Sequence, residues 1–355
     1  MKLADSIRAD YCRYILDFKF TAITSRQSMS QKETWFLRLT DLQTGKTGFG
    51  ECALFRGLSA DDTPDYDARL RHLCECINRG EELPPQTSSI SFGLETAVND
   101  LYNGGKRIIC QSGWTDGKYG IRTNGLIWMG SQEEMSVRIA QKLDEGFKCL
   151  KLKIGGIDFE QELKLLEHIR SRFDATALEL RLDANGSFSP KDALSKLERL
   201  SRYDIHSIEQ PIRAGQWFAM ASICRKSPIP IALDEELIGD SDDMRRESMF
   251  NIIQPSYIIL KPSLCGGMKA TERWIETAKA HKTGWWLTSA LESNIGLNAI
   301  AQLAAKHNVK RPQGLGTGLL YHNNIPSPLI LRGERLYYDT TSAAWNLEGI
   351  DFSNK

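Results

Sequence analysis

Between about residues 120 and 320, short apolar runs alternate with longer segments in which apolar residues recur every three or four positions. The first pattern is typical of buried parallel strands, and the second of helices that pack one face on a sheet. The predicted strands are Leu126–Met129, Cys149–Ile154, Leu178–Asp183, Ser207–Gln210, Ile229–Asp234, Tyr257–Lys261, Trp285–Ser289 and Gly314–Thr317. Eight such units in succession predict a closed α/β barrel.

Local capping signals support the helices between these strands. Ser131 followed by Glu134 is a capping-box pattern, and Ser189 before Pro190 is typical of an N-cap with proline in the first turn. Outer helices of a barrel should carry apolar residues on one face. Helices predicted from these signals and spacings include Lys191–Arg202, Gly267–His281 and Ile295–His307.

The chain outside this repeat has a different pattern. Its first part contains two strand-like segments, a glycine-rich turn and two segments with helical spacing. These are Tyr14–Phe20, Thr34–Thr40, Asp65–Asn78 and Ser91–Leu101. We therefore expect residues 1–118 to form an α+β capping domain and residues 119–320 to form the barrel. Residues 321–355, with a β-like stretch at Leu329–Tyr338, should pack back on the capping domain.

Composition narrows the class of partner. The 355-residue chain is 41% hydrophobic and 25% charged, and its 45 basic residues balance 45 acidic ones. These values are typical of a globular protein whose partner is a small molecule rather than a nucleic acid or a membrane surface. The N-terminus resembles no signal peptide, and no stretch reaches the roughly 18 apolar residues of a membrane span. We expect a cytoplasmic protein.

Eight cysteines and six histidines are dispersed along the chain. Without a secretion signal, free thiols in a reducing compartment are expected. No Cys-x-x-Cys or His-x-x-x-His pattern occurs, and such patterns are typical of zinc sites. Any bound metal should therefore have oxygen ligands.

Charged residues recur where the predicted strands end. Five consecutive strands end on Lys151 with Lys153, then Asp183, Glu209, Asp234 and Lys261. From Lys153 onward they are separated by 30, 26, 25 and 27 residues, about one strand–helix unit each. One such residue alone would usually serve solvation or a helix cap. Five in register should meet, because the carboxyl ends of barrel strands open on one mouth.

Three carboxylates in one mouth repel one another unless a cation offsets their charge. Oxygen ligands with open positions favour Mg²⁺, and Mn²⁺ would be able to substitute. We expect Asp183, Glu209 and Asp234 to be the ligands. Glu235 and Glu236 adjoin Asp234, so they are alternatives for the third position.

The lysines fit the same chemistry. Because side chains alternate along a strand, Lys151 and Lys153 should both point inward, with Lys261 opposite them. Neighbouring cations favour the neutral amine, so a lysine here would serve as a base. A base beside a metal-bound carboxylate can remove the proton α to it while the ion stabilises the enediolate. An alternative role for Lys151 is to neutralise the nearby acids.

In this order, K-x-K, D-x-N, E-Q-P, D-E and L-K-P-S resemble the muconate lactonizing enzyme subgroup of the enolase superfamily. The resemblance covers almost the whole chain, because Gly48–Ser59 is similar to the specificity loop of that family's capping domain. It implies a (β/α)7β TIM-like barrel with an α+β capping domain. It also implies the pairing of a lysine base with Mg²⁺ that is already known for enolase-superfamily sites.

Two segments bear on the reaction. Thr288–Gly296 resembles the S-S-x-x-E-S-x-x-G stretch of o-succinylbenzoate synthases, departing at Thr288. Gly314–Gly318 lacks the Asp-x-Asp with which dipeptide epimerases hold an ammonium group. The resemblance implies dehydration of a cyclohexadiene carboxylate, with Lys153 as base and Lys261 on the opposite face. N-acylamino-acid racemase, dipeptide epimerase and cycloisomerase activities are the alternatives. The predicted substrate contacts are Ser289, Ser293, Gly316, Thr317 and Asn185.

Overall fold

A parallel sheet of seven strands curls through the centre of the molecule, in the order β11-β10-β9-β8-β7-β6-β5. The computed structural model describes residues 2–23, 28–239, 242–341 and 344–353. The strands are β5 (Gly125–Ile127), β6 (Cys149–Lys153), β7 (Glu179–Asp183), β8 (Ser207–Glu209), β9 (Ile231–Leu233), β10 (Tyr257–Leu260) and β11 (Gly284–Leu287). Both ends of each lie within two residues of the predicted positions. Seven of the eight strand predictions are therefore confirmed.

The eighth stave is shorter than predicted. Gly314 pairs with Thr288 and Gln313 pairs with Thr123, both in parallel, and these two bridges close the barrel. The strand predicted to run on from Gly314 is wrong, because the chain turns into a short 3₁₀ helix, η3 (Gly316–Leu319). This turn brings residues 316 and 317 to the mouth of the barrel.

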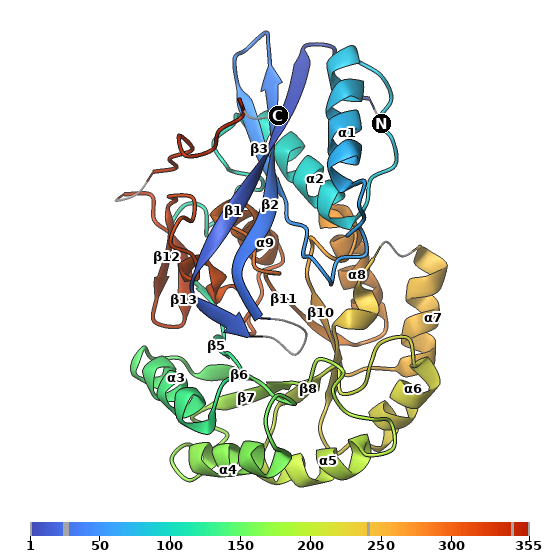
Figure 1. Ribbon diagram of the computed structural model, residues 1–355, viewed down its shortest axis with the longest axis vertical. Helices are drawn as coiled ribbons and strands as arrows, with labels where there is room; N and C mark the ends of the chain where they lie inside the picture. Colours follow the sequence, from blue (N-terminus) through green and yellow to red (C-terminus); the bar gives the residue numbers. More distant parts are fainter. Residues whose placement is uncertain (1, 24–27, 240–241, 342–343, 354–355) are drawn as a thin grey trace.

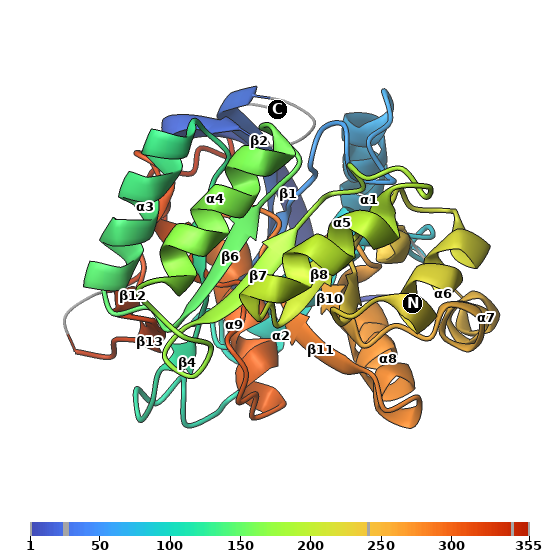
Figure 2. The same cartoon turned by 90° about the horizontal axis from the view of Figure 1, so that it is seen from below.

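Helices surround the sheet (Figure 2). They are α3 (Gln132–Asp144), α4 (Phe159–Arg170), α5 (Ala193–Leu200), α6 (Trp217–Lys226), α7 (Asp243–Ile253), α8 (Gly267–Ala280) and α9 (Asn294–Lys306). The predicted capping box of α3 is confirmed, since Ser131 and Glu134 exchange both bonds. Helix α5 begins two residues later than predicted, because the Ser189 hydroxyl accepts the Asp192 amide at 3.2 Å in a turn that precedes it.

The N-terminal unit packs beside the mouth of the barrel (Figure 1). Strands β1 (Ile7–Ile23), β2 (Ser28–Asp41) and β3 (Thr47–Cys52) form an antiparallel sheet, which packs against α1 (Tyr66–Arg79) and α2 (Ser88–Tyr102). A Cβ on Gly50 would lie 1.8 Å from the carbonyl oxygen of Gly93. Glycine therefore allows β3 to approach α2 closely.

The C-terminal residues contact both units. Strands β12 (Leu329–Arg332) and β13 (Arg335–Tyr338) form a sheet with β4 (Ile121–Arg122), which leads into the barrel. Tyr321 and Phe352 instead pack against Phe18 and Phe49 of the N-terminal sheet in tilted and edge-to-face arrangements, with ring centroids 4.7 and 5.8 Å apart. The β12–β13 hairpin thus covers the side of the barrel, and residues on either side of the hairpin contact the N-terminal unit.

Two further expectations concern the cysteines and membrane-spanning segments. All eight cysteines are free thiols, as predicted. Within the described ranges, no helix combines the length and the apolar character that crossing a membrane requires.

Candidate active site

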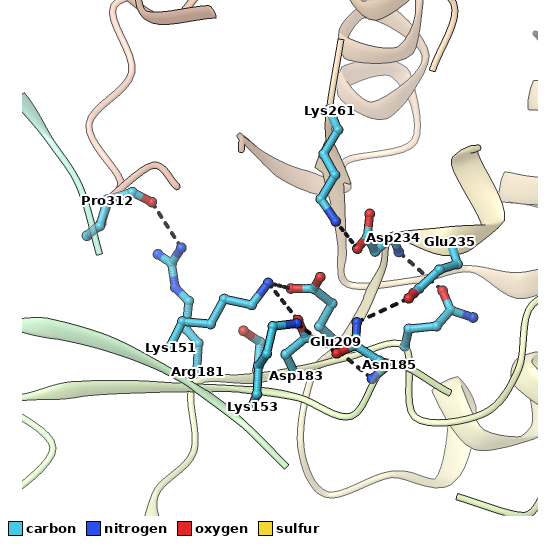
Figure 3. A network of polar contacts seen from close by, with 12 residues as sticks. Lys151, Lys153, Arg181, Asp183, Asn185, Glu209, Asp234, Glu235, Lys261 and Pro312 are labelled. Carbon is cyan, nitrogen blue, oxygen red and sulfur yellow. Dashed lines mark hydrogen bonds and ion pairs between the residues drawn. The ribbon is translucent and has the colours of Figure 1, made fainter. Parts of the chain in front are cut away.

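The charged residues at the strand ends converge in the structure (Figure 3). Strand pairing places Lys153 opposite Asp183 and Asp183 opposite Glu209. Both lysines of β6 reach Asp183 Oδ2, with Nζ distances of 2.9 Å for Lys151 and 3.1 Å for Lys153. Lys151 also forms an ion pair with Glu209. The two lysines therefore point to the same side of the strand, as its two-residue period requires.

Lys261 approaches from the other side of this cluster (Figure 3). Three strands separate β10 from β6 in the sheet, and the Lys261 ammonium pairs with Asp234. Asn185 links the two sides, because its Oδ1 accepts from Lys153 Nζ at 2.8 Å and its Nδ2 donates to Glu235 Oε1 at 3.1 Å. Its φ of +44° is left-handed, a conformation that asparagine tolerates better than most residues.

The ionisable groups of this buried cluster shift one another's pKa values. Burial raises the pKa of Glu209 well above its usual range, and the neighbouring Asp183 carboxylate raises it further. Burial also disfavours the Asp183 anion, but the Lys151 and Lys153 ammonium groups hold the pKa of Asp183 below its usual range. For Lys261, burial favours the neutral amine, yet the Asp234 and Glu209 carboxylates raise its pKa above the usual value. The surrounding carboxylates therefore favour the ammonium form of Lys261.

The chemistry of the carboxylates fits a hard cation. Glu209 Oε1 is buried and meets no hydrogen-bond donor among the described residues, a costly state for a charged oxygen. In this structure the carboxylates pair with lysine ammonium groups. Accordingly, within the described ranges, no three acidic, His or Cys side chains converge closely enough to act as ligands of one ion. Oxygen-only donors with an unsatisfied charge favour Mg²⁺ or a similar ion.

A cavity of about 480 Å³ opens onto this cluster. Its polar wall includes Lys153, Asp183 and Lys261, which the sequence predicted, and Glu235. Its apolar wall includes Phe20, Phe55, Leu58, Trp128, Leu291 and Leu319. Phe55 and Leu58 belong to the segment that resembles a specificity loop. Phe20 was not predicted, because only packing of the N-terminal unit brings β1 to the barrel mouth.

Four of the five predicted substrate contacts line the cavity, namely Asn185, Ser289, Gly316 and Thr317. The fifth, Ser293, is not among the residues that line the cavity. Its side chain is fully buried, and its hydroxyl donates to Glu51 at 2.6 Å and caps α9. A serine whose hydroxyl hydrogen is donated to a buried carboxylate has no donor left for the carboxylate or ketone of a ligand.

Comparison with known proteins agrees with this fold. A family model described as Enolase C-terminal domain-like matches residues 134–337. The muconate lactonizing enzyme of Pseudomonas fluorescens has the same fold, with a TM-score of 0.81 and 20% identity, covering 98% of this chain and 96% of that one. The chain belongs to the enolase superfamily, in its muconate lactonizing enzyme subgroup.

Other relatives are more similar in sequence to this chain than the muconate lactonizing enzyme is. The chain is 44% identical to the o-succinylbenzoate synthase of Desulfotalea psychrophila, over 91% of this chain and 96% of that protein. The crystal structure of MenC from the same organism superposes with a TM-score of 0.84 and 41% identity, covering 94% and 99% of the two chains. An L-Ala-D/L-amino acid epimerase of Maribacter sp. is 26% identical, over 82% of this chain and 85% of that protein.

Proposed function

We propose that this chain is an o-succinylbenzoate synthase, a carbon-oxygen lyase of menaquinone biosynthesis. Its substrate is 2-succinyl-6-hydroxy-2,4-cyclohexadiene-1-carboxylate, and its products are o-succinylbenzoate and water. The carrying observation is the 44% identity along 91% of the chain to a protein of that name. Identity to an epimerase is lower, at 26%. We place the reaction in the cytoplasm, a location supported by the free thiols.

Lys153 is the proposed base. Its Nζ takes the proton from the ring carbon that bears the carboxylate, and the adjacent carbon-oxygen bond breaks. The same Nζ returns the proton to the departing hydroxyl, which leaves as water while the new double bond completes the aromatic ring. One residue can serve both steps if proton and hydroxyl lie on the same face. Lys153 borders the cavity, and Asn185 orients its Nζ.

Lys261 and Lys151 have electrostatic roles in this proposal. The Lys261 ammonium borders the cavity on the side opposite Lys153, where it stabilises the negative charge that develops on the substrate. Lys151 also lines the cavity, and its ammonium pairs with both Asp183 and Glu209. These contacts support the alternative that Lys151 neutralises the acids rather than removing a proton.

The proposal includes Mg²⁺, with Mn²⁺ able to substitute, held by Asp183, Glu209 and Asp234. When bound, the ion supplies positive charge that offsets the ring carboxylate of the substrate. The unsatisfied Glu209 oxygen is the structural support for this assignment. Asn185 and Thr317 remain proposed substrate contacts, since both border the cavity.

The test is an assay of the purified protein on three substrate classes. We expect rapid dehydration of the cyclohexadiene carboxylate with Mg²⁺, and much slower racemisation of N-succinyl amino acids or epimerisation of Ala-Glu dipeptides. EDTA should abolish turnover. Epimerisation faster than dehydration would overturn the assigned reaction, and turnover that resists EDTA would overturn the assigned metal.

A further inference from the structure

The turn after β11 is held by one serine hydroxyl. Ser289 Oγ accepts the amide hydrogens of Leu291 and Glu292, at 3.1 and 3.2 Å. Leu291 has a φ of +66°, a left-handed conformation that is disfavoured for a bulky side chain and persists only where the surroundings impose it. The Tyr321 hydroxyl also donates to the Leu291 carbonyl, at 2.7 Å. The strained turn places the Leu291 side chain in the cavity wall.

Glu292 determines the direction of the hydrogen bonds at this turn. Its side chain is fully buried. Its two carboxylate oxygens accept from the hydroxyls of Ser263 and Ser289, both at 2.5 Å. Because Ser289 donates to Glu292, its oxygen serves as an acceptor for Thr317 Oγ1 at 2.8 Å. Glu292 therefore connects the loops after β10 and β11 to the eighth stave.

A second buried carboxylate secures this turn from the N-terminal unit. Glu51, at the end of β3, accepts from the Ser293 amide and from the Gly296 amide, both at 2.9 Å. These amides lie at the start of α9, where backbone N–H groups have no acceptor within the helix. A Cβ on Gly296 would lie 2.8 Å from Glu51 Oε2, so glycine leaves room for the carboxylate. Lys32 lies near both carboxylates; burial lowers its pKa, and the Glu51 and Glu292 charges oppose that shift.

We propose that Glu292 is a positioning residue for recognition of the substrate's side arm. It would act without contacting substrate, by holding Leu291 and Thr317 in the cavity wall through Ser289. The Ser289 hydroxyl donates its hydrogen to Glu292, and three donors share the two lone pairs of its oxygen, so it has no donor left for a carboxylate or ketone. The inference rests on the proposed function and replaces the predicted Ser289 contact with an indirect role.

The variant Glu292→Gln tests this role. It preserves side-chain shape but replaces one acceptor oxygen with an NH₂ donor, so one of the two serine hydroxyls loses its acceptor. We expect KM for the cyclohexadiene substrate to rise about 10-fold or more, as for loss of a hydrogen bond to a charged group, while kcat changes by less than about threefold. Amide exchange at residues 291 and 292 should accelerate in the ligand-free protein.

Asp100→Asn is the matched control. Asp100 is also fully buried and also accepts backbone amides, from Phe49 and Arg107 at 2.9 and 2.6 Å, but it lies in α2 and away from the cavity. Its variant should lose stability and keep the wild-type KM. Ser263→Ala is a milder second variant, which removes one donor to Glu292 and should raise KM in the same direction if Glu292→Gln does not fold.

The outcomes separate two claims. A raised KM in Glu292→Gln or Ser263→Ala, with a normal KM in Asp100→Asn, would support positioning by Glu292. An unchanged KM in both variants, or an equal rise in Asp100→Asn, would overturn it. If the wild-type protein does not dehydrate the substrate, the proposed function fails. Amide exchange then decides whether Glu292 holds the turn, because that measurement needs no substrate.

Discussion

The inside of the barrel holds two clusters of charged residues, one at the cavity and one deeper along the same strands. Side chains alternate along β7, so Arg181 and Asp183 point to the same inner face. The Arg181 guanidinium donates to Glu179 at 2.7 Å and to the Pro312 carbonyl at 2.9 Å, and it lies 4.3 Å from the Trp286 ring centroid. Both clusters contain a buried polar atom without a hydrogen-bond partner among the described residues, but in the deeper cluster this is Arg181 Nη2, which belongs to a cation, and at the cavity it is Glu209 Oε1, which belongs to a carboxylate.

The pKa shifts of Glu179 and Glu209, one carboxylate from each cluster, separate structural charge from functional charge. In the deeper cluster, burial raises the pKa of Glu179, but the charges of Arg181 and His206 and the hydrogen bonds from Arg181 and Cys149 together lower that pKa below the usual value. At the cavity, burial and Asp183 raise the pKa of Glu209. Stabilised charges of the first kind support the fold, whereas a destabilised anion beside a cavity is typical of a site that binds a cation or acts on a substrate.

If the cavity cluster is functional and the deeper cluster structural, the largest loss of turnover is expected for Lys153→Ala, at the cavity. Loss of a general base typically lowers turnover by about 10²- to 10⁴-fold. The variant should fold and bind Mg²⁺, since Lys153 pairs with Asp183 without being one of the proposed ligands. Turnover, Mg²⁺ titration and circular dichroism would check these points, with exposed Lys46→Ala as control. Near-normal turnover would contradict the base assignment.

A smaller loss of turnover is expected for Glu209→Gln and for Asp183→Asn. Each removes one proposed ligand, and metal-assisted charge stabilisation is worth several kcal/mol, or about 10²- to 10³-fold in rate. Excess Mg²⁺ should restore part of the activity, because the other ligands remain. Rates measured against Mg²⁺ concentration would show this as a shifted midpoint. Wild-type Mg²⁺ dependence in both variants would mean that the cavity cluster holds no metal.

The smallest effect is expected in the deeper cluster, for Glu179→Gln. Removing the partner of a buried arginine should cost about 1–3 kcal/mol of unfolding free energy at pH 7 and leave turnover near normal. Because the folded pKa of Glu179 is lowered, its contribution is present above the unfolded value of about 4.3 and is lost as pH falls below that. Urea unfolding of variant and wild type should differ at pH 7 and converge towards pH 3. A large loss of turnover would show that the deeper cluster is not merely structural.

The sequence by itself determined the strands and the set of charged residues at the mouth. Both signals are local and periodic. Apolar runs recur at the spacing of one strand–helix unit, and alternation along a strand decides that Lys151 and Lys153 share a face. The extent of the eighth stave was predicted wrongly, because two bridges, at Gln313 and Gly314, close the barrel without an apolar run.

Only the tertiary structure decided which neutral residues complete the site. Ser293 resembles a substrate contact in sequence, but its hydroxyl is bonded to Glu51, 242 positions away along the chain. Phe20 reaches the cavity because the N-terminal sheet packs over the barrel mouth. Such contacts depend on how two separately formed units pack, and packing between distant segments leaves no periodic trace in either segment.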